Sequence, residues 1–253
     1  MNRVFHLFYA VASYLAFLAS FLAMMAATLG IDRFGVRAID GPPRHAPVTA
    51  AVIDLGLIVA FGLQHSVMAR RGFKAAFGRW LPSSVERNTF VLASALAVAA
   101  IVLGWSPIAG MLWSFDGLGA RWALHGLSLL GYALTVASSF AIDHFELFGL
   151  KQGWAAVKGG TCEAPAFRVP LLYRWVRHPM QLGILIAVWA APRMSWGHVL
   201  FAMALTGYIL VGLAFEERDL VQRFGDQYAR YRAAVPALLP WPRPRPVRQA
   251  RPV

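Results

Sequence analysis

Two short polar clusters near the C-terminus combine residue types that could bind a charged ligand. Arg177-His178-Pro179 precedes one apolar stretch, and Glu216-Glu217 follows the next. Proline suits the first position of a helix because its missing N–H would be unpaired there, and the free amides of a helix start attract anions. The two glutamates could face a cation. A ligand with a carboxylate at one end and a sulfonium at the other would suit both clusters.

Long apolar windows predict the elements that position these clusters. Three of them contain no Asp, Glu, Lys or Arg: residues 4–31, 88–115 and 122–142. A bilayer span needs about 20 apolar residues, and the first window is too long for the apolar region of a signal peptide. Val48–Ala69 carries one acid and Met194–Phe215 none, whereas Met180–Ala191 is short. We predict an all-α polytopic membrane helix bundle with five full spans plus a short or re-entrant helix in a C-terminal helical hairpin.

The distribution of positive charge predicts the orientation of this bundle. The net charge is +12, and six crossings would leave 19 of the 24 Lys and Arg residues on the side that holds both chain ends. Positive loops face the cytoplasm, so we expect both termini to be cytoplasmic, in a bacterial-type inner membrane. This pattern explains the charge without a nucleic-acid partner.

The chain shows no second soluble domain. We predict one transmembrane domain over residues 1–240. Within it, residues 173–235 form a hairpin and an amphipathic helix, because apolar residues recur at spacings of 4, 4 and 3: Leu220, Phe224, Tyr228 and Tyr231. Residues 241–253 are rich in Pro and Arg, which predicts a disordered tail.

The predicted topology brings further polar residues to the cytoplasmic side. They are His65, His144 and Gln152, which join His178, Glu216 and Glu217 at one membrane level. Such a group suggests a site that opens to cytosol and bilayer. The alternative is that polar residues simply collect at helix ends, where they hydrogen-bond within the bundle.

Several other chemistries lack their sequence patterns. The chain has no P-loop, no Gly-x-Gly-x-x-Gly and no Gly-x-Ser-x-Gly. The histidines lack His-x-x-x-His spacing, so we expect no metal. A transporter would place charges near the midplane, and the only candidate, Asp54, lies too far out.

The hairpin resembles an integral-membrane methyltransferase superfamily that includes isoprenylcysteine carboxyl methyltransferases and phospholipid N-methyltransferases. The matching residues are Arg177-His178-Pro179, Gly183, Glu216-Glu217-x-x-Leu220-x-x-x-Phe224-Gly225-x-x-Tyr228-x-x-Tyr231, Val235-Pro236 and Pro240. Two further stretches resemble methanethiol S-methyltransferases, which make dimethyl sulfide: Gln64-His65-Ser66 and His144-Phe145-x-Leu147-Phe148-Gly149-Leu150-x-Gln152.

The resemblance implies S-adenosyl-L-methionine as the methyl donor. By motif position, the donor pocket would include Gln152, Phe167, Arg168, Tyr173, His178, Pro179, Met180, Gln181, Gly183, Glu216 and Glu217. The superfamily often has Tyr two residues after the Pro, where this chain has Gln181, so the role of that side chain is open.

The resemblance also implies a small thiol substrate, methanethiol, that reaches the site from the membrane. A thiol must lose its proton to become a good nucleophile, and a histidine of near-neutral pKa suits the base. The sequence does not rank His65 and His144 for this role. Two alternatives stay open: a sister enzyme acting on a lipid amine, a prenylcysteine carboxylate or another thiol, and a non-catalytic membrane accessory protein of the same fold.

Overall fold

The computed structural model describes residues 3–33, 35–79, 82–160, 162 and 166–240, so the predicted tail 241–253 lies outside it. Five of the described helices are long and apolar enough to cross a membrane. They are α1 (Arg3–Thr28), α2 (Pro47–Ala69), α4 (Ser83–Gly104), α5 (Leu118–Ile142) and α9 (Trp196–Phe224). Most of their side chains face outward, since 22–33% of each apolar window is buried. The predicted all-α membrane bundle with five full spans is confirmed.

The remaining elements are short. They are α3 (Arg71–Phe77), α6 (His144–Leu147), α7 (Leu150–Val157), the 3₁₀ helix η1 (Leu171–Arg174), α8 (Pro179–Trp189), α10 (Asp226–Ala234), and the strands β1 (Met111–Ser114) and β2 (Arg193–Ser195). At about 1.5 Å per residue, the 11 residues of α8 cover about half of a hydrocarbon core about 30 Å thick. The predicted short helix is therefore present.

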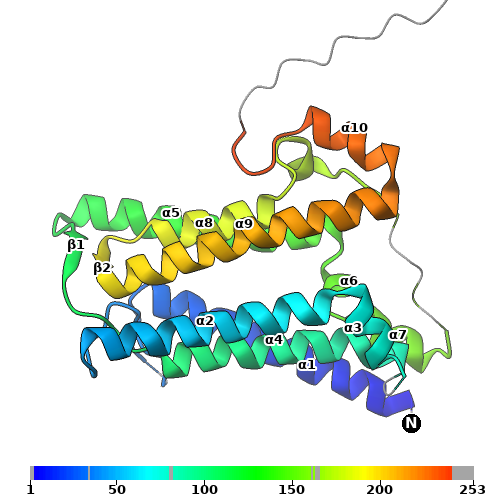
Figure 1. The fold of residues 1–253 in the computed structure, drawn as a ribbon, viewed down its shortest axis with the longest axis horizontal. Coiled ribbons are helices and arrows are strands. Elements are labelled where there is room, and N and C mark those ends of the chain that lie inside the picture. The colour runs from blue at the N-terminus through cyan, green and yellow to red at the C-terminus, as the bar shows by residue number, and fades with distance from the viewer. Residues whose placement is uncertain (1–2, 34, 80–81, 161, 163–165, 241–253) are drawn as a thin grey trace, which may run out of the picture.

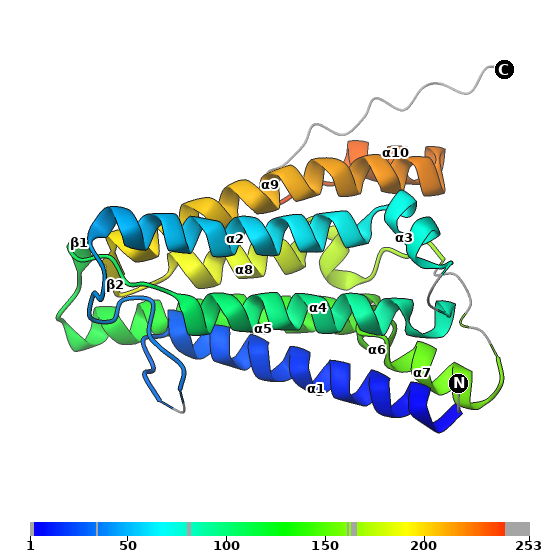
Figure 2. The same ribbon diagram turned by 60° about the horizontal axis from the view of Figure 1, so that its bottom comes forward.

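The two ends of the bundle differ in character. Figures 1 and 2 show α3, α6, α7, α10 and the N-terminus at one end, which we call the polar end, and β1 and β2 at the other. The antiparallel pairing of β1 with β2 takes residues from the ends of two windows that were predicted to be spans, 88–115 and Met194–Phe215, so both helices are shorter than those windows at this end. The start of α1 lies at the same end as α10 (Figures 1 and 2). This agrees with six passes along the bundle, five by the long helices and one by the segment that contains α8.

The last long helix does not stop where the apolar stretch stops. α9 continues through Glu216 and Glu217 to Phe224, and Gly225 then breaks the helix with φ +53° before α10 begins. The predicted amphipathic helix is thus divided: Leu220 and Phe224 end α9, whereas Tyr228 and Tyr231 belong to α10. The two glutamates lie within a rigid helix rather than at its exit.

Small residues bring α5 and α8 into close contact. A Cβ on Gly183 would lie 2.5 Å from the carbonyl oxygen of Gly131, and a Cβ on Gly131 would lie 2.5 Å from that of Gly183. Hydroxyls cross the same interface, where Ser128 donates to the Ala187 carbonyl at 2.8 Å and Thr135 to the Met180 carbonyl at 3.1 Å. Close approach of this kind replaces hydrophobic driving force between membrane helices, and it fixes the depth at which α8 begins.

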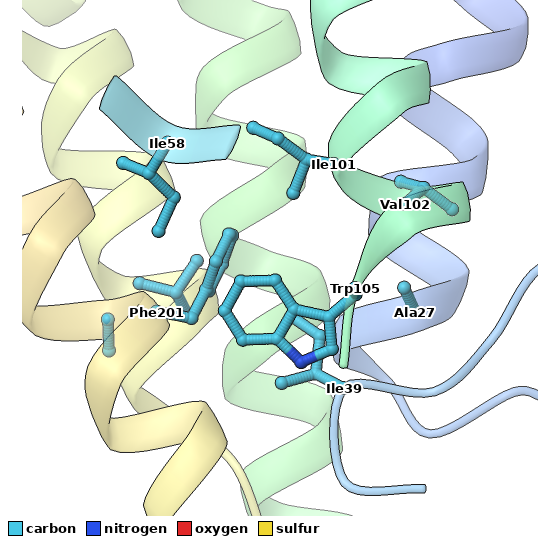
Figure 3. Packing of buried hydrophobic residues seen from close by; sticks show 9 residues of the cluster. Ala27, Ile39, Ile58, Ile101, Val102, Trp105 and Phe201 are labelled. Carbon is cyan, nitrogen blue, oxygen red and sulfur yellow. The ribbon is translucent and has the colours of Figure 1, made fainter. Parts of the chain in front are cut away.

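A tight apolar cluster lies in the half of the bundle away from the polar end. Trp105, which follows α4, is 1% exposed and packs edge-on against Phe201 of α9 at 5.4 Å. Figure 3 shows Ile58, Ile101 and Ile39 around this pair. The cluster joins α1, α2, α4, α8 and α9, so it provides a firm base from which these helices extend toward the polar end.

Candidate functional site at the polar end

The start of α8 is held by the chain that follows α10. The backbone N–H groups of Arg177 and His178 donate to the carbonyls of Pro236 and Ala237 at 2.9 and 3.0 Å. The Tyr231 hydroxyl donates to the Tyr173 carbonyl at 2.6 Å. Residues about 60 positions apart are therefore joined, and α10 closes over the entrance to α8.

A buried ion cluster anchors this region. Oε1 of Glu217 accepts from Nε of Arg177 at 2.7 Å, from Nη2 of Arg177, and from Nε2 of His178 at 3.1 Å, while Oε2 faces Nε of Arg232 at 3.0 Å. The side chains of Arg177 and Glu217 are 4% and 11% exposed. A carboxylate only accepts, so the proton of His178 is on Nε2. Both oxygens of Glu217 are already engaged within the protein.

Glu216 is placed differently, because neighbouring residues on a helix point about 100° apart. Its side chain is 48% exposed, its Oε2 accepts from Gln181 Nε2 at 3.3 Å, and it lies 3.9 Å from Nδ1 of His178. The predicted proximity of His178 and Glu216 is confirmed. Glu216 keeps a carboxylate available to a cation, which Glu217 does not.

Tyr173 lies beside this pair at the edge of the bundle. Its hydroxyl donates to the Ser138 carbonyl at 3.4 Å. Burial, with added repulsion from the charge of Glu216, raises the pKa of Tyr173 above its ordinary value. The phenol therefore stays protonated and acts as a hydrogen-bond donor.

The N-terminus of α8 presents backbone donors. Pro179 occupies its first turn, and in the described part of the chain no side chain caps the helix start. The first amide to bond back within the helix is that of Leu182, which donates to the His178 carbonyl at 3.0 Å. The amides of Met180 and Gln181 precede it, so this helix start can accept an anion.

His65 lies on α2 in an aromatic environment that one polar atom enters. Its ring lies 4.7 Å from that of Phe90 and 5.3 Å from that of Phe61, while Tyr208 of α9 lies 6.5 Å away. Nδ1 is 3.0 Å from the Ser94 hydroxyl. Among the described residues, Nε2 has no hydrogen-bond partner in the structure.

His144 is placed as a packed core histidine. Nε2 bonds the Tyr14 hydroxyl at 2.9 Å and Nδ1 bonds the Ser139 hydroxyl at 2.8 Å. Phe140 stacks on the ring at 4.1 Å. Burial lowers the pKa of His144 below its ordinary value, against the opposing charge of Asp143. With both nitrogens engaged, this ring has none left for a substrate.

Three other predicted residues lie apart from the His178–Glu216 pair. Gln152 is on α7, which packs against α1 and α4; its Nε2 donates to the Glu146 carbonyl at 3.2 Å, and its buried Oε1 has no partner in the described part of the chain. Phe167 packs between α9 and α10, 5.4 Å from Phe224. Arg168 is exposed, and its charge helps Lys151 to lower the pKa of Asp143 against the effect of burial.

The structure thus joins His178, Gln181, Glu216 and Glu217 by direct contacts and places Gly183 against α5 instead. The predicted donor pocket did not include Arg177, and neither Arg232 nor Ser94 had a predicted role. A signal for Arg177 existed, because it accompanies His178 in the motif, whereas nothing in the spacing marked Arg232 or Ser94. No group of three or more His, Cys, Asp or Glu side chains in the described ranges could hold a metal ion.

Fold and charge distribution define a polytopic membrane protein with a cluster of charged side chains at one end of its helix bundle. The chain is 44% identical to a methanethiol S-methyltransferase of Mycobacterium tuberculosis, over 96% of this chain and 98% of that one. It is also 44% identical to methanethiol S-methyltransferase 2 of Bradyrhizobium diazoefficiens, over 94% and 91%. Nurim of Sus scrofa is a more distant relative, 31% identical over 66% of each chain.

No family model and no solved structure matches the chain. The curated relatives nevertheless cover nearly its whole length. The chain therefore belongs to the methanethiol S-methyltransferase family, and it is a methyltransferase.

Proposed function

We propose that this protein methylates methanethiol to dimethyl sulfide with S-adenosyl-L-methionine as donor. The observation that supports it most directly is the 3.9 Å approach of His178 to Glu216 beside an uncapped helix start, in a chain 44% identical to methanethiol S-methyltransferases. The relatives make the lipid, prenylcysteine and accessory-protein alternatives less favoured.

The residues at the start of α8 fit an amino-acid ligand with a cationic sulfur. The amides of Met180 and Gln181 suit its carboxylate, because a helix N-terminus favours negative charge. Glu216 suits its cation. Gln152 lies apart from this pair, so its role in the donor pocket remains a prediction from the resemblance. Pro179 sets the helix start, while Tyr173 and His178 line the edge where Glu216 lies.

Other predicted pocket residues have contacts that favour supporting roles. Glu217 holds Arg177 and His178 in place, and Gly183 lets α8 approach α5. Phe167 packs against Phe224 of α9 and against Tyr228 and Tyr231 of α10. The exposed Arg168 remains a predicted contact from the resemblance alone.

S-adenosyl-L-methionine, when bound, would supply a methyl group on a sulfonium, which becomes a neutral thioether once the acceptor sulfur takes the methyl. The protein must then hold the acceptor and accept its proton. We assign the base to His65, because its Nε2 is open, and we assign His144 to packing, because both of its nitrogens are bonded. General bases of this kind contribute about 10²–10⁴-fold in rate.

We place the protein in the cytoplasmic membrane with the polar end facing the cytoplasm. Among the Lys and Arg residues, 19 of 24 belong to the segments that the six passes group with the chain ends. This orientation would give the site access to a donor from the cytosol and to a volatile thiol from the bilayer.

Ligand titration in detergent tests the donor site. We expect wild type to bind both S-adenosylmethionine and S-adenosylhomocysteine, and Glu216→Gln to weaken the charged sulfonium ligand by about tenfold but the neutral thioether less. Asp226→Asn, which changes an exposed carboxylate at the start of α10, is the matched control. Equal affinities in wild type and Glu216→Gln would remove Glu216 from the site.

Headspace gas chromatography of cells fed methanethiol tests the reaction. We expect dimethyl sulfide from wild type and from Asp226→Asn, and little from Glu216→Gln. Parallel assays with lipid amines and prenylcysteine separate the sister activities. If the protein methylates one of those acceptors and forms no dimethyl sulfide from methanethiol, the assignment of methanethiol as the substrate is wrong.

A further inference from the structure

A cavity of about 170 Å³ opens at the polar end between α2, α3 and α4. Its apolar wall consists of Met68, Ala69, Phe73, Phe77 and Phe90. Pockets for drug-sized ligands have about 300–1,000 Å³. A cavity of this size therefore excludes a nucleoside-sized donor and admits a ligand of a few heavy atoms.

The cavity leads toward His65. Phe90 forms part of its wall and also contacts the His65 ring, with centroids 4.7 Å apart. Met68 forms another part, and its sulfur accepts from Gln64 Nε2 at 3.1 Å. The His65 ring therefore lies behind one aromatic ring of the cavity wall.

Positive charge borders the same space. Arg87 lines the cavity, with its Nε donating to the Leu147 carbonyl at 2.6 Å, and Lys74 pairs with Glu86 across the rim at 3.5 Å. A cation beside a thiol stabilises the thiolate. The cavity therefore combines an apolar wall for a methyl group with a field that favours ionised sulfur.

The cavity also adjoins the helix that carries Glu216. Arg70 follows the cavity residue Ala69, its guanidinium lies 4.2 Å over the Phe215 ring, and it pairs with Asp219 at 3.7 Å. Phe215 immediately precedes Glu216. An α2–α9 contact next to the cavity therefore lies one residue along α9 from Glu216.

We propose that this cavity is the binding chamber of the thiol acceptor, which enters it at the membrane edge and passes His65 on its way to the donor. The proposal rests on the proposed function. It assigns acceptor selection to α2, α3 and α4, whereas the donor residues lie on α8 and α9.

Kinetics of cavity variants test the chamber. Ala69→Phe fills it, and Val67→Phe is the matched control, because Val67 lies on the same helix but is 48% exposed outside the cavity lining. We expect Ala69→Phe to raise the KM for methanethiol by about tenfold with the S-adenosylhomocysteine affinity unchanged. Phe73→Ala enlarges the cavity and should therefore raise the methylation rate of butanethiol relative to that of methanethiol. An unchanged methanethiol KM in Ala69→Phe, with the ligand affinity intact, overturns the proposal.

A second measurement does not need turnover. In a Cys162→Ser background, Ala69→Cys is labelled with a maleimide in the presence of dimethyl sulfide, the inert product that shares the methylthio group. We expect slower labelling of Ala69→Cys and no change for Val67→Cys. If wild type methylates no thiol, the proposed function fails, while this protection still decides on the cavity. A labelling rate of Ala69→Cys that is the same with and without dimethyl sulfide rules the chamber out.

Discussion

Replacing Glu217 should lower the stability of the folded protein, whereas replacing its neighbour Glu216 should leave that stability nearly unchanged. Glu217→Gln removes the charge that Arg177, His178 and Arg232 share. Arg177 would then face neutral acceptors, namely the amide oxygen of the substituted side chain and the carbonyls of Arg232 and Val235. Its guanidinium is 4% exposed, so it cannot turn to water without opening the contact between α10 and η1.

The magnitude follows from burial. Removing one partner of a buried ion pair costs about 3–5 kcal/mol, because the other charge stays buried. On the scale of globular proteins of this size, where 1 kcal/mol shifts Tm by about 2–4 °C, Tm should fall by roughly 6–20 °C. Glu216 is half-exposed and has one long hydrogen bond, and exposed pairs contribute about 0–1 kcal/mol.

Thermal unfolding of the purified protein in one detergent, with both single variants side by side, measures this difference. Arg177→Met combined with Glu217→Leu should lose less stability than Glu217→Gln, because neither buried charge then remains unpaired. Equal Tm values for Glu216→Gln and Glu217→Gln, or a Tm of Glu217→Gln within about 2 °C of wild type, would refute the division of roles between the two glutamates.

Three further predictions concern other parts of the bundle. Gly131→Ala should destabilise the protein by about 1–3 kcal/mol, because its Cβ would meet the α8 backbone at 2.5 Å, while Gly126→Ala on the same helix meets nothing within 4 Å and should not; thermal unfolding of the pair checks this. His65→Gln should lower the methylation rate by about 10²-fold or more, whereas His144→Gln should lower it less than tenfold and mainly reduce stability; equal rate losses in single-turnover assays would contradict the assignment of the base. Stability should fall as pH drops below the ordinary histidine pKa of 6.5, because burial lowers the pKa of His144 in the folded protein and the unfolded chain then binds more protons. The Tm difference between about pH 7.5 and about pH 5.5 should therefore be smaller in His144→Gln than in wild type. An equal Tm difference in the two proteins would contradict this role of His144.

The cavity at α3 could not be read from the sequence. Its lining combines residues from the end of α2, from α3 and from the start of α4. The side-chain directions that enclose a space depend on how α2 and α4 pack, which composition does not reveal. The same holds for Ser94, whose contact with His65 joins positions 29 apart.

The pairing at the other end of the bundle was equally hidden. Asp40 lies in a loop, yet its carboxylate accepts from the Ser195 amide at 2.9 Å and from Nδ1 of His198 at 2.8 Å. Burial opposes ionisation, but these two hydrogen-bond partners outweigh it and lower the pKa of Asp40. Nothing in the local pattern around Asp40 points to a partner 158 positions away.

The sequence by itself determined the five long apolar helices, the short helix that begins at Pro179 and the end of the bundle at which the polar residues gather. It could do so because the length of an uncharged window decides whether a segment can span a bilayer, and the distribution of Lys and Arg decides its orientation. Both are local properties of the sequence. Only the tertiary structure decided which of the two adjacent glutamates is free and which histidine has an open nitrogen. Both depend on rotation about a helix axis and on neighbours distant in the chain, and a step of one residue turns a side chain by about 100°.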